Sequence, residues 1–348
     1  MRQSATFAIP GDIDTLTGGY IYEKQLLLAL RRIGWDVTHL PLPAGFPEPS
    51  PQDVAATAAA LAAVPADRPL ILDGFLPGAS PPEVLAGVRA PMISVTHHPL
   101  AYETGLAPDR AAWLKRTEQA NLARMSHVIV PSRHTAQMLI DDFAVPGERI
   151  TVASPGILRP ARSTAPKPQP PRILSVGQLV PRKGHDILLR ALATLTDLDW
   201  QAEIVGGATD PACARDLERL CDDLGLSDRV AFTGSLSPET LAARYAAATL
   251  FALATRYEGY GMVFAEALAA GLPIVTCAAG AVPDTVPEGT GLLVPPDDAD
   301  AFAEALRRLL SDRESRTAFA AAADAAGHAL PTWEDTARLV ARQLARLA

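Results

Sequence analysis

Short apolar segments alternate with longer amphipathic segments along the whole chain, and this alternation restricts the possible folds more than any other feature. In the first half, apolar segments predict strands at residues 5–9, 36–41, 70–72, 92–96, 127–131 and 149–152. Helices are predicted between them, for example at 20–33 and 109–125. Largely apolar strands separated by helices are typical of a parallel sheet covered on both faces. We therefore predict a doubly wound α/β domain here.

A proline-rich segment, RPARSTAPKPQPPR at residues 159–172, follows near the middle of the chain. Proline at this density favours an extended, semi-rigid linker, and a surface loop within one domain is the alternative. Beyond it the alternation restarts, with strands predicted at 173–176, 201–205, 230–232, 249–254, 274–277 and 292–294. Helices are predicted at 186–195, 212–224, 238–247, 263–270, 299–310 and 333–347.

These segments predict two doubly wound, Rossmann-like α/β domains facing across a cleft. The domains are expected at residues 1–158 and 173–330, with a linker at 159–172 and a C-terminal helix within 331–348. The length of 348 residues agrees, because roughly 150 residues per domain gives about two domains. Open α/β sheets bind ligands at the carboxyl ends of their strands, so the site is expected in the cleft.

Composition and charge exclude several classes of protein. Acidic residues outnumber basic ones by 39 to 31, for a net charge of −8, which argues against a nucleic-acid binder. The three cysteines, at 213, 221 and 277, cannot make a disulfide framework, so a reducing cytosol is the expected compartment. No targeting segment is expected, because the N-terminal apolar stretch ATFAIP is too short for a signal-peptide core. No membrane-spanning helix is expected either, because glycine and proline break the uncharged stretch 267–282. Peripheral contact of one edge of the protein with a membrane surface is compatible with this composition.

The richest motif is TRYEGYGMVFAEALAAGLPIV at residues 255–275, where a strand leads through a glycine-flanked loop into a helix. Amides at such a helix start can hold an anion such as a phosphate. Glu258 precedes the helix and Glu266 lies on it. The structural alternative makes Glu258 a capping acid and Glu266 a solvated residue. Against that alternative, the helix around Glu266 is strongly apolar, where an unpaired carboxylate is costly.

A second motif, SVGQLVPRKGHDILLRA at residues 175–191, places two adjacent cations after a strand. Arg182 supplies a forked donor and Lys183 a point charge, a combination that suits a diphosphate. A solvated basic turn is the alternative explanation for this pair.

Several other polar residues also have both a functional and a structural interpretation. His97 and His98 end a predicted strand, which is either a ligand-facing position or a plain polar pair. Asp12 and Asp14 form a DxD pattern beside a glycine pair, but no other acidic partner is implied and no metal site is predicted. Ser132 is expected to be a helix N-cap. The remaining histidines, which show no such grouping, are interpreted as structural: His39, His127, His134, His185 and His328.

These motifs together resemble the retaining glycosyltransferases of family 4, which have the two-domain GT-B fold. EGYGMVFAEALAAGLPIV is similar to the family's glutamate–seven residues–glutamate signature, and GQLVPRKGHDILLRA to its phosphate-binding segment. PGDIDTLTGGY, GAVPDTVPEGTGLLVPPDDADAFAEAL and TWEDTARLV resemble further family segments, in the family's order. Leu158 departs from the pattern, because an aspartate is common at that position.

The resemblance implies a role for each matching residue on the donor side of the reaction. Glu266 would bind the nucleotide ribose, and Glu258 the hydroxyls of the donor sugar. Arg182 and Lys183 would neutralise the leaving diphosphate. The loop amides that would hold the sugar and diphosphate belong to Gly259, Tyr260 and Gly261.

In the N-terminal domain the resemblance points to a histidine and a glycine pair. His97 would contact the donor sugar, with His98 as the next best match. Gly18 and Gly19 would let the first loop approach the diphosphate closely, because no side chain intervenes. The final helix would cross back to the N-terminal domain.

The sequence thus predicts a metal-independent, retaining glycosyltransferase without a cofactor. It would move a sugar from a nucleotide-diphosphate donor, with a UDP-sugar favoured, to a hydroxyl of a glycan, glycolipid or small molecule by front-face attack. A nucleotide-sugar epimerase, a sugar phosphorylase and a non-catalytic binding subunit are the alternatives. The sequence leaves the acceptor, the donor base and sugar, and the oligomeric state open.

Overall fold

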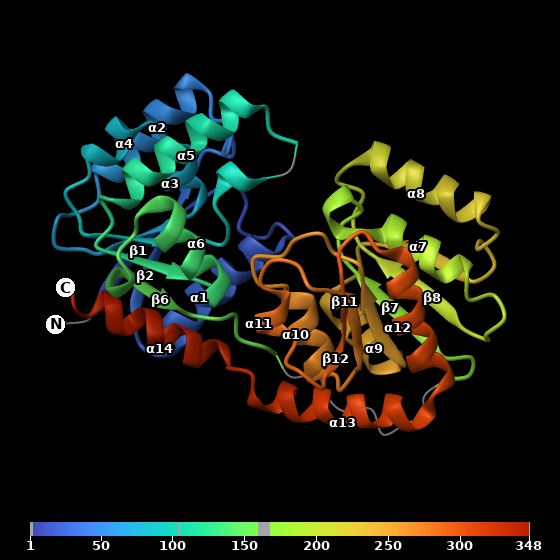
Figure 1. The fold of residues 1–348 in the computed structure, drawn as a ribbon. Coiled ribbons are helices and arrows are strands. Elements are labelled where there is room, and N and C mark those ends of the chain that lie inside the picture. The colour runs from blue at the N-terminus through green and yellow to red at the C-terminus, as the bar shows by residue number, and fades with distance from the viewer. Residues whose placement is uncertain (1–2, 104, 159–167, 348) are drawn as a thin grey trace. The chain divides into compact units, whose positions relative to one another are not determined.

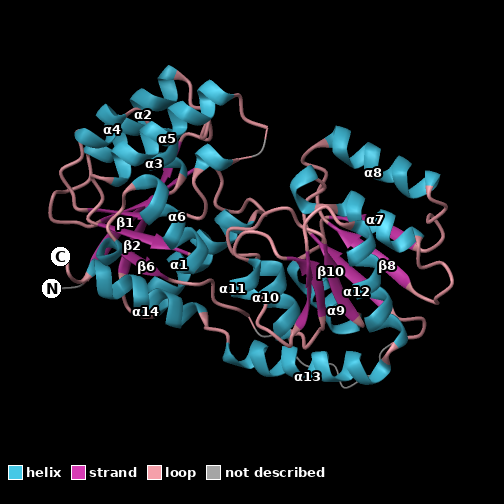
Figure 2. Cartoon of the chain, in the orientation of Figure 1, coloured by secondary structure: helices cyan, strands magenta, loops and turns pink. Residues whose placement is uncertain are grey.

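The computed structural model describes residues 3–103, 105–158 and 168–347, and it divides into two compact units. One unit comprises Met1–Gly156 and Pro331–Ala348, and the other comprises Ile157–Leu330. Each unit contains a six-stranded, fully parallel sheet flanked by helices, so the predicted α/β class is confirmed (Figures 1 and 2). Most of the predicted linker, at residues 159–167, lies outside the described residues.

The N-terminal sheet has the strand order β2-β1-β3-β4-β5-β6, with every pair parallel. Its strands are β1 (Ser4–Pro10), β2 (Asp36–Leu42), β3 (Leu70–Asp73), β4 (Met92–Val95), β5 (His127–Val130) and β6 (Ile150–Val152). Its helices are α1 (Gly18–Arg32), α2 (Pro51–Ala62), α3 (Phe75–Ala79), α4 (Pro82–Ala86), α5 (Pro108–Leu122), α6 (Arg133–Phe143) and α14 (Trp333–Leu344). The carboxyl ends of β1, β3 and β4 meet at one edge, because adjacent strands run in the same direction.

Alternate strand residues bury the two faces of the N-terminal sheet against different helices. Leu70 and Leu72 join one apolar cluster with residues of helices α2 to α6. The C-terminal helix α14 packs against α1 instead. Glu334 of α14 accepts a hydrogen bond from Arg32 of α1 at 2.6 Å, and Thr336 donates to the carbonyl of Ser154 at 2.7 Å. Helix α14 is thus an integral part of the N-terminal unit.

The C-terminal sheet has the strand order β12-β11-β10-β7-β8-β9, again with every pair parallel. Its strands are β7 (Arg172–Val176), β8 (Gln201–Val205), β9 (Val230–Gly234), β10 (Leu250–Leu253), β11 (Ile274–Cys277) and β12 (Gly291–Val294). Its helices are α7 (His185–Ala193), α8 (Pro211–Asp223), α9 (Pro238–Ala247), α10 (Met262–Ala269), α11 (Val282–Thr285), α12 (Ala299–Ser311) and α13 (Arg313–Ala329). Because β7 and β10 are neighbours, the loops that follow them emerge side by side.

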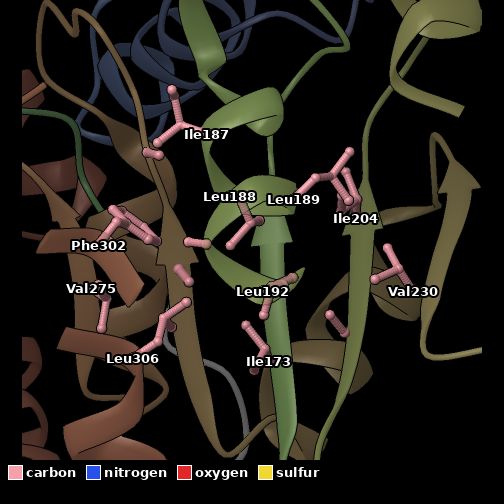
Figure 3. Packing of buried hydrophobic residues seen from close by; sticks show 14 of the residues in the cluster. Ile173, Ile187, Leu188, Leu189, Leu192, Ile204, Val230, Val275, Phe302 and Leu306 are labelled. Carbon is pink, nitrogen blue, oxygen red and sulfur yellow. The ribbon is translucent and has the colours of Figure 1, made fainter. Parts of the chain in front are cut away.

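Helices α7, α8 and α12 bury one face of the C-terminal sheet. Leu188 and Leu192 of α7 pack in one cluster with Ile173 of β7, and Phe302 and Leu306 of α12 extend it (Figure 3). The opposite face packs against α9, α10, α11 and α13 in a separate cluster. Covering both faces explains why these strands are almost continuously apolar.

Helices α2 and α13 are the main departures from the predicted elements. Helix α2 has no counterpart among the predicted helices; it begins at Pro51, with Ser50 and Asp53 forming a capping box. Helix α13 was not predicted because its buried face is built from small residues, which give no large apolar periodicity. A Cβ at Gly327 of α13 would lie 2.3 Å from the carbonyl oxygen of Leu268 of α10. The small residues therefore allow α13 to approach α10 closely.

The predicted N-cap at Ser132 is confirmed, because its hydroxyl accepts a hydrogen bond from the amide of Thr135 at the start of α6.

Candidate active site

The loop after β10 is held in a defined shape by a glycine turn and by hydrogen bonds from residues that follow β11 to its backbone carbonyls. Gly261, the N-cap of α10, has φ of +85°, and a Cβ there would lie 2.5 Å from the Phe264 ring. Glycine is therefore required at this position. The carbonyl of Glu258 accepts from the amide of Ala281 at 2.8 Å, and that of Tyr260 accepts from the Thr285 hydroxyl at 2.5 Å. The amides at the start of α10 are consequently preorganised.

Glu258 is buried in this loop, 6% exposed, and three side chains surround its carboxylate. Oε1 accepts from Lys183 Nζ at 2.6 Å and from the Thr255 hydroxyl at 3.0 Å, while Arg182 Nη1 lies 3.6 Å from Oε2. Burial alone would raise the pKa of this carboxyl, but the charges of Lys183 and Arg182 outweigh it and hold the pKa below its usual value. Glu258 is therefore an ionised, paired carboxylate rather than a capping acid.

The turn that carries Arg182 and Lys183 is fitted tightly against the end of β10. Gly184 has φ of +63°, and a Cβ there would lie 1.9 Å from the carbonyl oxygen of Ala254. Arg182 donates to the carbonyl of Tyr257 at 2.8 Å, so its guanidinium reaches across to the loop that holds Glu258. The two predicted motifs are thus in direct contact, and the solvated-turn alternative does not describe this pair.

Arg256 is a residue of this region that sequence reasoning missed. Its guanidinium bonds the carboxylate of Asp186 at 2.9 and 3.0 Å and that of Asp297 at 2.6 Å, and its amide donates to the carbonyl of Arg182. This network ties the loop after β10 to the start of α7. The available signal was its position, since Arg256 lies three residues after the end of the buried strand β10.

Glu266 lies on α10 and is partly buried rather than solvated. Its Oε2 accepts a hydrogen bond from the Tyr245 hydroxyl at 2.8 Å. Burial raises the pKa of Glu266 to about 7, although the bond from Tyr245 acts in the opposite direction. Glu266 consequently changes its charge near neutral pH, which affects any hydroxyl that it binds.

In the N-terminal unit, His97 follows β4 at the carboxyl edge of the sheet and packs against the start of α1. A Cβ built at Gly19 would lie 3.4 Å from His97 Cδ2, an ordinary van der Waals contact, so the imidazole lies directly beside the start of α1. Gly18 is the first residue of α1, and no atom of the described chain lies within 4 Å of a Cβ built there. His98 faces a different neighbour, with Nε2 3.9 Å from the exposed carboxylate of Glu103.

Two buried carboxyl groups beside His97 were not predicted. Glu23 of α1 is fully buried and Asp73, at the end of β3, is 4% exposed. Glu23 Oε1 lies 3.4 Å from His97 Nε2. Asp73 could have been noticed from its place at a strand end, but Glu23 gives no such signal.

Among the described residues, Asp12 and Asp14 of the DxD pattern contact residues that are near them in the sequence. Asp12 accepts a hydrogen bond from the amide of Asp14 at 2.9 Å, and Asp14 forms an ion pair with Lys24. Leu158, where the family often has aspartate, is 73% exposed. Among the residues that the structure describes, no helix has the length and apolar character needed to cross a membrane.

Comparison with known proteins gives consistent matches over nearly the whole chain. The family model "Glycosyltransferase Family 4" matches residues 21–157, and "Glycosyl transferases group 1" matches residues 160–325. An MMP alpha-(1->4)-mannosyltransferase from Mycolicibacterium hassiacum is 32% identical over 293 residues, which are 78% of this chain and 69% of that protein. A GDP-mannose-dependent alpha-(1-6)-phosphatidylinositol monomannoside mannosyltransferase from Mycolicibacterium smegmatis is 38% identical over 176 residues, 47% of this chain and 44% of that one. The chain spans about half the length of several curated relatives that it matches.

The structure of a sucrose-phosphate synthase from Thermosynechococcus elongatus matches with a TM-score of 0.86 and 25% sequence identity, covering 99% of both chains. Together with the two parallel sheets, this similarity defines a protein of the GT-B class. The chain belongs to glycosyltransferase family 4, among the group 1 glycosyl transferases. The family resemblance seen in the sequence is thereby confirmed.

Proposed function

We propose that this protein is an active glycosyltransferase that moves a sugar from a nucleotide-diphosphate donor to an acceptor hydroxyl with retention of configuration. The observation that carries the proposal is the contact between Arg182, Lys183 and Glu258 at the carboxyl edge of the C-terminal sheet. A binding subunit would need the nucleotide contacts alone. Here the two cations, which can bind the leaving group, lie in contact with the carboxylate of Glu258, which can bind the sugar.

The two cations have a defined chemical task in this reaction. Negative charge develops on the diphosphate as the bond to the sugar breaks, and preorganised donors stabilise that charge without reorganisation. Arg182 and Lys183 supply such donors, together with the amides of Gly259, Tyr260 and Gly261. In the present structure Lys183 is occupied by Glu258. We infer that a bound diphosphate competes for Lys183, which frees Glu258 to accept hydrogen bonds from the sugar.

Glu266 would hold the ribose of the donor in this proposal. Its carboxylate can accept hydrogen bonds from two vicinal hydroxyls, while the bond from Tyr245 fixes its orientation. In the N-terminal unit, His97 would contact the donor sugar and the surrounding loops would bind the acceptor. Gly18 and Gly19 would leave room for the diphosphate at the start of α1.

Retention is proposed to follow from front-face attack, in which a donor phosphate oxygen accepts the proton of the acceptor hydroxyl. No added metal or cofactor is proposed for this step, because Arg182 and Lys183 can neutralise the leaving group. Activity that survives excess EDTA would support a metal-independent reaction. Loss of activity in EDTA would instead indicate a metal ion, for which Asp12 and Asp14 are the candidate ligands. Analysis of the product anomer decides retention, since an inverted linkage would overturn the mechanism.

The donor base and sugar are tested by a panel. A UDP-sugar is favoured by the resemblance, whereas one relative is named as GDP-mannose-dependent, so the panel needs both UDP- and GDP-sugars. A ligand present at 100 times its Kd should stabilise the protein by about 2.7 kcal/mol, which a thermal-shift assay detects. If no nucleotide or nucleotide sugar stabilises the protein, the proposed donor class is wrong.

The reaction itself is tested by release of nucleoside diphosphate with the stabilising donor and a set of glycans, glycolipids and polyols. Arg182→Ala should abolish most of the release, while Arg219→Ala on α8, an exposed arginine paired with Asp216, is the matched control. Conversion of the donor without an acceptor would indicate an epimerase. Consumption only with inorganic phosphate would indicate a phosphorylase. Binding without turnover over the whole panel would favour a binding subunit.

A further inference from the structure

Three ionisable side chains from three elements meet at the carboxyl edge of the N-terminal sheet. Glu23 comes from α1, Asp73 from the end of β3 and His97 from the residues after β4. Neither carboxylate oxygen of Glu23 accepts a hydrogen bond within the described chain, and His97 Nε2 is likewise buried without one. His97 Nε2 lies 3.4 Å from Glu23 Oε1, and the carboxyl groups of Glu23 and Asp73 interact directly once one of them carries a proton. These groups depend on one another for hydrogen bonding.

A hydrogen bond between two carboxyl groups requires that one of them keeps its proton. Asp73 Oδ1 already accepts from the amide of Phe75 at 2.6 Å, and Glu23 is fully buried, so both charges together would be costly. Burial raises the pKa of Glu23 to about 7, and burial followed by the charge of Glu23 raises that of Asp73 well above its usual value. Burial lowers the pKa of His97. Near neutral pH the cluster therefore holds a neutral imidazole beside a carboxyl pair that still carries a proton.

The surroundings of the cluster contribute little further charge. Tyr20 of α1 donates to the carbonyl of Pro10, and its pKa is raised to about 12, chiefly by burial and then by Asp73, Glu23 and Asp12. It therefore stays neutral over the pH range of interest. Asp12, an exposed residue after β1, adds a solvated negative charge.

The imidazole of His97 is also fixed by packing. The Tyr22 ring meets it edge-on at 5.0 Å between centroids, and Trp333 of α14 meets Tyr22 at 5.5 Å. The Tyr22 hydroxyl donates to the carbonyl of Ala153 at 2.8 Å, which locks this stack. A quarter of the His97 side chain remains exposed. The ring is thus held on one side and open on the other, with Nε2 directed at Glu23.

We propose that Glu23 is a positioning residue that decides which ring nitrogen of His97 carries the hydrogen. When the Glu23 carboxyl is neutral it donates to Nε2, so the hydrogen of the neutral imidazole lies on Nδ1. When Glu23 is ionised it accepts from Nε2–H, and Nδ1 becomes an acceptor. One proton thus moves on and off the carboxyl pair, and the imidazole changes tautomer without changing charge. The consequence for catalysis rests on the proposed function, in which His97 contacts the donor sugar.

The first experiment needs neither donor nor acceptor. The full chain, labelled with ¹⁵N at histidine, is titrated from about pH 5.5 to 8.5, and two-bond ¹H–¹⁵N correlations report the tautomer of each imidazole; His97→Ala assigns the signals. In the wild type, His97 should exchange its Nδ1–H form for its Nε2–H form in a step centred near pH 7. In Glu23→Gln this step should be absent. An identical titration in both proteins, or one unchanging tautomer in the wild type, overturns the proposal.

Two further variants guard against misinterpretation. Glu103→Gln is the matched control, because its exposed carboxylate faces His98 and should leave the His97 step unchanged. Asp73→Ala removes the side chain whose hydrogen bond lowers the pKa of Glu23, and should therefore move the step to a higher pH. If Glu23→Gln does not fold, Asp73→Ala still decides, since a step that does not move to higher pH contradicts the proposal.

A kinetic experiment separates failure of this inference from failure of the proposed function. With an active donor and acceptor pair, the wild-type kcat should show a step near pH 7 that Glu23→Gln lacks, while the donor KM of the two stays within about twofold at each pH. A tautomer step by NMR without any effect of Glu23→Gln on kcat would keep the positioning of His97 and remove His97 from the reaction. A kcat profile lost in Glu23→Gln without a tautomer step would overturn the positioning.

Discussion

Lys183 and Glu258 form a nearly buried ion pair, with Nζ 2.6 Å from Oε1, although 75 residues separate them in the chain. The pair exists because β7 and β10 are adjacent in the C-terminal sheet and their following loops meet. Its two members have different proposed partners in the reaction, the diphosphate and the sugar. Donor binding would therefore exchange an internal contact for two contacts with the substrate.

Replacing Lys183 should affect both stability and rate. Lys183→Met leaves Glu258 buried with weaker compensation, which should lower the free energy of unfolding by about 3 kcal/mol. Loss of a donor to the leaving group should add about 2–4 kcal/mol to the barrier, a decrease in kcat of about 30- to 1000-fold. Chemical denaturation and initial-rate assays measure the two effects.

The double variant Lys183→Met/Glu258→Gln distinguishes these effects. It removes both charges, so it should regain most of the lost stability while its kcat stays low. Turnover at the wild-type rate in Lys183→Met would exclude this residue from the diphosphate site.

Donor binding should depend on pH through Glu266. Since burial raises the pKa of its carboxyl to about 7, the donor KM should fall as the pH rises from 6 to 8.5 and the ribose-binding carboxylate forms. Tyr245→Phe removes a hydrogen bond that lowers this pKa, so the fall should occur at higher pH. Glu266→Gln should have a high donor KM without this pH dependence. A wild-type KM profile in Glu266→Gln would contradict ribose binding.

A side chain at Gly261 should destabilise the protein by a steric clash as well as by backbone strain, and Gly289 serves as a control for the strain alone. Gly261 and Gly289 share nearly the same φ, +85° and +83°, but only Gly261 has a neighbour, the Phe264 ring, where a Cβ would lie. Gly289→Ala should therefore cost only the backbone strain, about 1 kcal/mol. Gly261→Ala should cost about 2–3 kcal/mol and lower kcat, because the amides at the start of α10 shift. Urea denaturation and kcat of both variants, compared side by side, give the answer; equal effects would show that strain alone matters.

Stability should fall as the pH rises, because of the buried carboxyl of Glu118. Burial raises its pKa from 4.5 to about 8, even though it accepts a hydrogen bond from the amide of Leu100. Between these two values the folded protein binds more protons than the unfolded chain, so the free energy of unfolding decreases with pH. The full loss from this group, reached above about pH 8, is on the order of 5 kcal/mol.

Glu118→Gln tests this directly. The variant should be more stable than the wild type at pH 8.5, and the advantage should shrink toward pH 5. Glu83→Gln on α4 replaces an exposed glutamate and should leave the pH dependence of unfolding as it is in the wild type. Parallel pH dependences for Glu118→Gln and the wild type would show that Glu118 is not protonated in the folded state.

The periodicity of the sequence was sufficient to predict the architecture, because each strand and helix carries its own local signal. Strands β8 and β11, with observed bounds Gln201–Val205 and Ile274–Cys277, coincide with their predicted ranges. Helix α13 was missed because alanines and Gly327 form its contact with α10, and small residues produce no apolar period. Its formation depends on the close approach that only the packed structure defines.

The candidate site likewise contains residues that the sequence indicates and residues that only the tertiary structure reveals. Arg182, Lys183, Glu258 and His97 could be singled out from the sequence, since each follows a predicted strand at the edge where parallel sheets bind ligands. The buried pair Glu23 and Asp73 could not, because a single glutamate on an amphipathic helix has the same local pattern whether it faces solvent or a second acid. Local chemistry determined which residue types stand at the strand ends. Strand order and burial decided which of them touch and which keep their protons, because both depend on neighbours distant in the chain.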